Sequence, residues 1–351
     1  MEKHIFFVHS GGAQGSPGQG SFDLVEWLRC SLEEEYRIHY PIIEKPEEPT
    51  YGMWKAMFDK EFPNLVGEVI LIGHSLGGSM LLKYLSEVKI EFQIKALFLI
   101  AIPFWGESGW SMDDFDLKNH FSKHLPVLPT VHFFHSFDDK IVPFQHVELY
   151  KSHFPNAIIH KINGNDHAFV DGLPKLVEQI NIVHLNSEII ETKKELLQVI
   201  SLFNDYDINT IPAFGGWSAG QILEHITKAV SPEILYGMVK KSDRRHNEKL
   251  KAIKRDFLDF NSKMKSPDFI EPTESIHYVE DMILKIEKKF ETLIEASNTL
   301  DLSEICIEFT LPVYGEFTRL EWIYFFMYHI QRHIYQLKKV SELKRKFNGN
   351  P

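Results

Sequence analysis

Short runs of apolar residues recur through the first half of the chain, and the segments between them carry apolar residues at helical spacing. The runs predict buried strands at residues 4–8, 36–43, 69–72, 95–101, 130–135 and 157–162. The spaced pattern predicts helices at residues 22–34, 54–62 and 171–183, and from residue 80 onward. Strands that alternate with helices are typical of a parallel sheet covered by helices, so we expect an α/β domain over residues 1–185.

Beyond residue 188 the pattern changes to long helical stretches. The predicted helices cover residues 188–204, 218–240, 274–298 and 319–345, and the first strand-like run is 305–311. Ser218 with Gln221, and Thr318 with Glu321, fit the capping box that begins a helix. We therefore expect an all-α four-helix bundle over residues 188–351, with the junction near 184–190. The charged stretch 240–265 is interpreted as a solvated helix and connection.

Composition narrows the class of protein. Of the residues, 44% are hydrophobic and 25% are charged, which is typical of a globular protein. The length of 351 residues suggests two domains. No apolar run approaches the roughly 20 residues that cross a bilayer, and the apolar run at the N-terminus is too short for a secretory signal. Two cysteines, Cys30 and Cys306, exclude a disulfide framework and favour a cytoplasmic location. The net charge of −11, without a basic excess in either half, argues against nucleic acid as a partner.

One motif dominates the first half. A predicted strand at 69–72 leads into a G-x-S-x-G sequence, which is followed by a helix: Gly73-His74-Ser75-Leu76-Gly77. Strand, tight turn and helix are the context of a nucleophile elbow, in which the turn presents the serine hydroxyl beyond the end of the sheet. The sequence therefore predicts that Ser75 is a nucleophile.

Two later strand ends carry acids and a histidine, in the segments 136–143 and 163–169. A serine needs a histidine to take its proton, and the histidine needs a carboxylate to orient it. The chain order Ser, Asp, His and the sequences Asp-x-x-Val-Pro and Gly-x-x-His resemble the α/β-hydrolase family. The resemblance implies Asp139 as the acid and His167 as the base, with Asp138 as the competing acid if the register slips by one residue.

The glycine-rich loop 9–18 follows the first predicted strand and exposes backbone N–H groups. Such a loop could bind a phosphate or contribute to an oxyanion hole, and we favour the latter because the loop lacks the Lys-Ser/Thr ending of a P-loop. The opening sequence at 6–12 and the motif at 73–77 resemble small serine hydrolases of the retinoblastoma-binding-protein-9/YdeN type. The resemblance implies that the backbone N–H groups of Leu76 and of Gly11 or its neighbour hold the oxyanion. Residues 104–126 are interpreted as a small lid or loop.

Three histidines lie on apolar helix faces of the second half. His329 and His333 are four residues apart on one predicted helix and share a face, and His225 lies on the apolar face of another. Three imidazoles that meet at one point would form a site with open positions for a divalent transition metal, Zn²⁺ or Ni²⁺. The sequence therefore predicts a metal site made of His225, His329 and His333.

The same half resembles the DinB-like superfamily of four-helix metal proteins. The likeness rests on residues 217–225, on the pre-helix turn 311–318 and on the His-x-x-x-His helix at 328–337. Members of that superfamily include thiol-dependent transferases, isomerases and proteins without an assigned activity, so the resemblance implies a metal more firmly than a reaction.

From these observations we predict a serine hydrolase, of the carboxylesterase or thioesterase type, fused to a metal-binding bundle. Its expected partner is a small acyl ester or a related small molecule, without a membrane partner. Two alternatives remain open: a metal- and thiol-dependent transferase centred on the bundle, or a bundle that only docks a partner or forms a homodimer. Metal content separates the last alternative from the others, because a docking module needs none.

Overall fold

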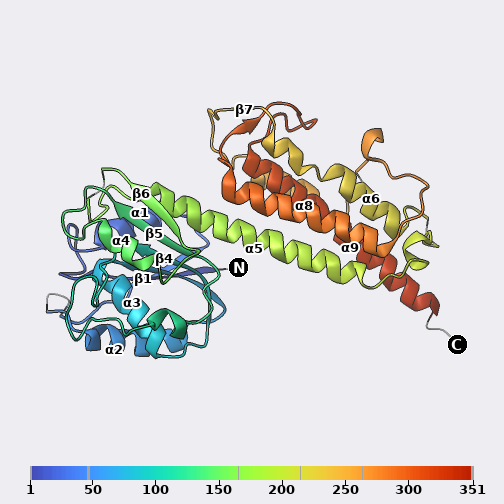
Figure 1. Ribbon diagram of the computed structural model, residues 1–351. Coiled ribbons are helices and arrows are strands. Elements are labelled where there is room, and N and C mark those ends of the chain that lie inside the picture. Colours follow the sequence, from blue (N-terminus) through green and yellow to red (C-terminus); the bar gives the residue numbers. More distant parts are fainter. Residues whose placement is uncertain (1, 46–47, 165, 214, 263, 349–351) are drawn as a thin grey trace. The chain divides into compact units, whose positions relative to one another are not determined.

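The computed structural model describes residues 2–45, 48–164, 166–213, 215–262 and 264–348 (Figure 1). The chain divides into two compact units, Met1–Val183 and His184–Pro351. Within the described residues, no helix combines the length and the apolar character needed to cross a bilayer.

The first unit is built on a six-stranded parallel sheet, with the strand order β2-β1-β3-β4-β5-β6. The strands are β1 (Lys3–Val8), β2 (Tyr36–His39), β3 (Glu68–His74), β4 (Gln93–Ile100), β5 (Val131–Ser136) and β6 (Ile158–Ile162). The helices are α1 (Phe22–Ser31), α2 (Tyr51–Glu61), α3 (Ser75–Glu87), α4 (Gln145–Tyr150) and α5 (Pro174–Ile200). The α/β fold predicted from the sequence is confirmed.

Alternate residues of the strands face two different cores, as the two-residue period of a strand requires. On one face, α1 and the first turns of α5 pack against Ile5, Phe7, Ile70, Ile72, Phe98 and Ile100. On the other face, α2, α3 and α4 cover Phe6, Val8, Leu71, Leu97, Leu99 and Phe133. Burial on both faces explains why these strands are continuous apolar runs in the sequence.

Besides shifts at other helix and strand ends, two features of this unit differ from the prediction. The strand predicted at 36–43 ends at His39, because Pro41 cannot donate a backbone hydrogen bond and β2 lies at the edge of the sheet. The helices predicted at 171–183 and 188–204 are one continuous helix, α5. Helical spacing continues through 184–190, where Leu185 and Ile189 are buried, and no glycine or proline interrupts it.

The second unit is a helical bundle, as predicted, to which one short antiparallel strand pair is added. The later part of α5 packs with α6 (Ala219–Ala229), α8 (Val279–Thr299) and α9 (Arg319–Asn348) around one apolar core (Figure 1). Both predicted capping boxes are present: Ser218 Oγ accepts from Gln221 N at 3.2 Å, and Thr318 Oγ1 accepts from Glu321 N at 3.2 Å.

Three predictions for this unit are wrong in extent. The helix predicted at 218–240 ends at Ala229, because Pro232 follows and disfavours helical backbone before it. The strand predicted at 305–311 is only β8 (Ile305–Cys306), paired with β7 (Val239–Lys240). The charged stretch 240–265 contains α7 (Leu250–Leu258), whose apolar side is buried against the bundle rather than solvated.

Candidate functional site

The turn between β3 and α3 has the geometry of a nucleophile elbow. Ser75 adopts a φ of 51°, in the left-handed region that a non-glycine residue rarely occupies. The glycines around it allow a close approach of backbones: a Cβ on Gly73 would lie 2.4 Å from the Cα of Gly78. A Cβ on Gly77 would lie 1.9 Å from the carbonyl oxygen of His9. The spacing of glycines in the motif is therefore a packing requirement of the turn.

The structure brings Ser75, Asp139 and His167 together in one hydrogen-bonded series. His167 Nε2 lies 2.9 Å from Ser75 Oγ, and His167 Nδ1 lies 2.8 Å from Asp139 Oδ2. All three residues are buried. The serine follows β3, the aspartate follows β5 and the histidine follows β6, so the carboxyl ends of three parallel strands supply the site.

Asp139, and not the competing Asp138, contacts His167. The second carboxylate oxygen of Asp139 accepts backbone N–H bonds from Ile141 and Val142, both at 2.9 Å. Asp138 is exposed and accepts a hydrogen bond from the hydroxyl of Ser136 instead. Of the two aspartates, Asp139 is therefore the one placed against His167.

The surroundings of Asp139 favour its charged form. Burial opposes ionisation, but the hydrogen bond and charge of His167 and the two backbone N–H groups outweigh it and hold the pKa of Asp139 below 3.8. His135 Nε2 donates to the carbonyl of Val142 at 2.7 Å and lies 3.5 Å from the Asp139 carboxylate. An ionised Asp139 can fix the tautomer of His167 and stabilise a positive charge on it.

The loop after β1 lies against the start of α3. A Cβ on Gly11 would lie 3.5 Å from the side chain of Leu76, so the two residues whose N–H groups were assigned to an oxyanion hole are neighbours. The loop is fixed by His9, whose Nδ1 lies 2.7 Å from the hydroxyl of Tyr40 and whose Nε2 donates to Gly12 O at 3.1 Å. Ser10 N–H donates to Ser21 Oγ at 3.0 Å and is therefore used within the fold.

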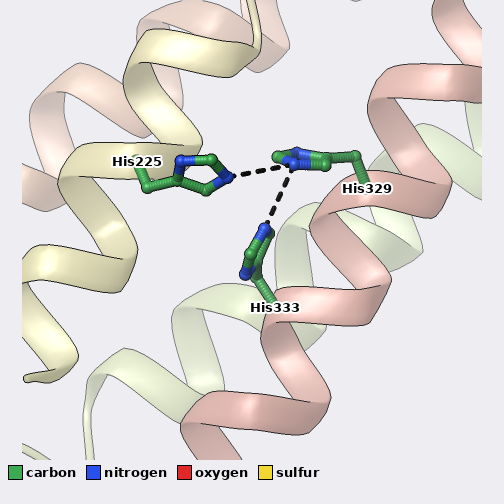
Figure 2. A group of neighbouring side chains, drawn as sticks. All are labelled: His225, His329 and His333. Atoms are coloured by element: carbon green, nitrogen blue, oxygen red, sulfur yellow. Dashed lines mark hydrogen bonds between the residues drawn. The ribbon is translucent and has the colours of Figure 1, made fainter. Parts of the chain in front are cut away.

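The second unit brings the three predicted histidines to one point (Figure 2). His329 Nε2 lies 3.2 Å from His225 Nε2 and 3.1 Å from His333 Nε2. One ring comes from α6 and two come from successive turns of α9. The ligand atoms of the three residues all lie within 4.8 Å of one another, and all three residues are buried.

In two of the rings, a hydrogen bond from Nδ1 determines that the lone pair lies on Nε2. His225 Nδ1 donates to the carbonyl oxygen of Ile270 at 2.8 Å, and His333 Nδ1 donates to Gln336 Oε1 at 2.7 Å. Because a neutral imidazole carries one proton, both Nε2 atoms then present lone pairs toward His329. Neither Ile270 nor Gln336 was expected from the sequence.

This arrangement fits a divalent transition metal. Burial lowers the pKa of all three histidines, that of His333 to about 3, and so keeps the rings neutral as ligands must be. If His329 Nε2 carries a proton, it can donate that proton to Nε2 of His225 or of His333, but not to both. The lone pair of the other Nε2 then lacks a donor, and a cation between the three nitrogens would satisfy all of them. Its Nδ1 is buried without a hydrogen-bond partner among the described residues. Zinc–nitrogen bonds of about 2.0–2.1 Å in tetrahedral geometry separate the nitrogens by about 3.4 Å, close to the distances here.

Comparison with known proteins agrees with the two units. Residues 25–171 match the serine hydrolase family, and residues 188–337 match the DinB superfamily. The chain therefore joins an N-terminal serine hydrolase domain of the α/β-hydrolase type to a C-terminal DinB-like domain, and both predicted resemblances are confirmed.

Individual relatives are distant. Over 158 residues, 43% of this chain, the sequence is 26% identical to the uncharacterized protein YuaE of Bacillus subtilis (strain 168) and covers 94% of it. The structure of the ydeN gene product of B. subtilis is 16% identical, with a TM-score of 0.43, over 52% of this chain and 98% of that one. A putative YdeN-like hydrolase from Pectobacterium atrosepticum is 15% identical, with a TM-score of 0.37, over 48% of this chain and 80% of that one.

Proposed function

We propose that the N-terminal unit hydrolyses esters or thioesters of small acyl groups, with Ser75 as nucleophile, His167 as base and Asp139 as the orienting acid. The observation that carries this proposal is the uninterrupted hydrogen bonding from Asp139 through His167 to a serine on a strained elbow. Neither hydrogen bond requires a rotamer change before the serine can lose its proton.

In the proposed reaction, Ser75 Oγ attacks the acyl carbonyl while His167 Nε2 takes the hydroxyl proton. The negative charge that develops on the carbonyl oxygen is stabilised by the backbone N–H groups of Leu76 and Gly11. His167 then gives its proton to the leaving alcohol or thiol, and the acyl group stays on Ser75. Water, deprotonated by His167, hydrolyses the acyl-enzyme and regenerates the serine.

Hydrolysis of p-nitrophenyl esters and of an acyl thioester by the full-length protein tests this proposal. We expect Ser75→Ala to abolish turnover with the fold intact, because the alanine cannot form the acyl-enzyme. Ser86→Ala is the matched control, since Ser86 lies on the same helix and its hydroxyl donates to the backbone carbonyl of Lys83 rather than to the triad. We expect Ser86→Ala to keep wild-type turnover, and turnover that survives in Ser75→Ala would contradict the assignment.

A second proposal concerns the bundle, because the three converging lone pairs favour it. We propose that His225, His329 and His333 hold a divalent metal, Zn²⁺ or Ni²⁺, with Ile270 and Gln336 orienting two of the rings. When bound, such a metal supplies a Lewis acid that can lower the pKa of a bound water or thiol. The buried apolar surroundings would keep bulk water from the centre, and a thiol-dependent transferase reaction is one use of such a site.

Metal content of the purified protein tests the second proposal. We expect about one equivalent of metal in the wild type and a large loss in His225→Ala, His329→Ala and His333→Ala. His246→Ala is the control, because His246 is exposed and outside the cluster. Equal metal content in all variants would exclude this centre and leave a docking or dimerisation module as the remaining role of the bundle.

A further inference from the structure

His74 is a buried histidine that the proposed reaction does not use. It ends β3 directly before Ser75 and is 1% exposed. Its ring lies beside that of His167, with ring centroids 5.3 Å apart.

Hydrogen bonds connect His74 to the two loops that flank the nucleophile. Its Nε2 lies 2.9 Å from the backbone carbonyl oxygen of His167. Its Nδ1 lies 2.9 Å from Ser21 Oγ, and Ser21 Oγ accepts the backbone N–H of Ser10 at 3.0 Å. Ser10 precedes Gly11, the proposed oxyanion donor, so the series runs from the oxyanion loop through the nucleophile strand to the loop of the base.

The direction of each bond follows from the groups involved. A carbonyl oxygen only accepts, so His74 Nε2 carries the proton that it donates to His167 O. Burial lowers the pKa of His74 to about 3, so the ring is neutral and its Nδ1 is an acceptor. Ser21, which accepts from Ser10 N–H, donates its hydroxyl proton to that Nδ1.

We propose that His74 is a positioning residue that holds the base loop and the oxyanion loop at fixed distances from Ser75. This inference rests on the proposed role of Ser75 as the nucleophile. The two loops follow different strands, β6 and β1, and neither strand pairs with the other in the sheet. Because His74 lies on the nucleophile strand and is hydrogen-bonded toward both loops, it can fix the position of each loop relative to Ser75. Displacement of a reacting group by about 1 Å can lower the rate about 100-fold.

The first test compares His74→Leu with His74→Gln in the full-length protein. Leucine fills space but donates no proton, whereas the amide of glutamine can restore the donor to His167 O. We expect His74→Leu to lower kcat for p-nitrophenyl acetate and the rate of fluorophosphonate labelling by about 10–100-fold with KM nearly unchanged, because the acyl site itself is not altered. His74→Gln is expected to recover most of the loss.

The matched control is His132→Leu. His132 is a buried histidine of β5 that hydrogen-bonds Thr130 and His160, away from the triad, so its loss affects packing without touching either loop. We expect normal labelling per folded molecule in this variant, measured well below its unfolding temperature.

A second variant, Ser21→Ala, cuts only the branch to the oxyanion loop. We expect a smaller decrease in kcat than in His74→Leu, and no further decrease when Ser21→Ala is added to His74→Leu, because the branch is already broken. This variant also carries the test if His74→Leu fails to fold.

Two results would overturn the inference: wild-type kcat in both His74→Leu and Ser21→Ala, or an equal decrease in His132→Leu. Failure of the parent proposal is recognised separately, because the wild type would then neither label nor depend on Ser75, and the positioning role would fall with it.

Discussion

At the scale of single residues, two neighbouring aspartates have opposite environments. Asp139 is buried and bonded to His167, whereas Asp138 is exposed and bonded to Ser136. We expect Asp139→Asn to lower kcat by about 10³–10⁴-fold, because the amide cannot fix the required tautomer of His167. Asp138→Asn is the matched control and is expected to stay within about twofold of the wild type in the same ester assay. The reverse order would show that Asp138 is the acid.

Gln336 offers a second test at this scale, on the proposed metal centre. Its Oε1 accepts from His333 Nδ1, and loss of such an outer partner typically weakens metal binding by about 10–100-fold. We therefore expect Gln336→Leu to bind Zn²⁺ about that much more weakly in a competition with a chelating dye, while Gln336→Glu keeps an acceptor and retains affinity. Gln331→Leu, on the same helix but bonded to Thr192, is the control. Equal affinities in all four proteins would remove Gln336 from the centre.

At the scale of elements, the start of α3 depends on a contact that no larger residue permits. A Cβ on Gly77 would lie 1.9 Å from the carbonyl oxygen of His9, whereas a Cβ on Gly52 in α2 would meet only Thr50 Oγ1 at 3.8 Å. We expect Gly77→Ala to lower the free energy of unfolding by about 1–3 kcal/mol and to impair hydrolysis, since α3 must move away from the loop.

Gly52→Ala is the opposite case and serves as its control. An exposed helical glycine replaced by alanine typically gains about 0.5–1 kcal/mol of stability. Denaturant unfolding measures both changes, and a Gly77→Ala variant as stable and active as the wild type would contradict the close packing of this turn.

The sequence pattern predicted most helices and strands, because the residues that each element buries are apolar and recur at the spacing of that element. Strands β3, β4 and β5 are buried on both faces and therefore stand out as apolar runs, and Ser218 and Thr318 begin their helices with local hydrogen bonds. Helix ends were less predictable. The continuity of α5 and the end of α6 depend on how far packing extends, which the spacing of apolar residues does not determine.

For the candidate sites, the sequence indicated the central residues but not the partners that orient them. The motif at 73–77 and the spacing of His329 and His333 identified residues whose chemistry is local. The partners that orient them were not predicted, because Ile270 O is a backbone carbonyl 45 residues from His225 and Ser21 is 53 residues from His74. Such contacts arise from the tertiary fold and leave no pattern along the chain.

At the scale of the whole molecule, buried neutral histidines make the first unit sensitive to acid. Burial lowers the pKa of His74 and of His132 from 6.5 to about 3. Between pH 6.5 and pH 3, these histidines bind protons in the unfolded chain but not in the native unit. We therefore expect the free energy of unfolding to be highest above about pH 6.5 and to decrease as the pH falls toward 3. The expected slope is about 1.4 kcal/mol per pH unit for each histidine.

Hydrogen exchange of the β4 amides, measured from pH 7 to pH 5, follows this loss within the full chain. We expect His132→Gln to reduce the slope by the contribution of one histidine. An unchanged slope would mean that His132 is not held neutral in the native unit.

The central claim, that this chain carries an activated serine in its N-terminal unit, is tested most directly by its reaction with a fluorophosphonate. Intact-mass measurement and peptide mapping report how many adducts form and where. We expect a single adduct on Ser75, absent in Ser75→Ala and formed much more slowly in His167→Gln. A wild-type protein that forms no adduct, or one whose adduct persists in Ser75→Ala, would contradict the claim.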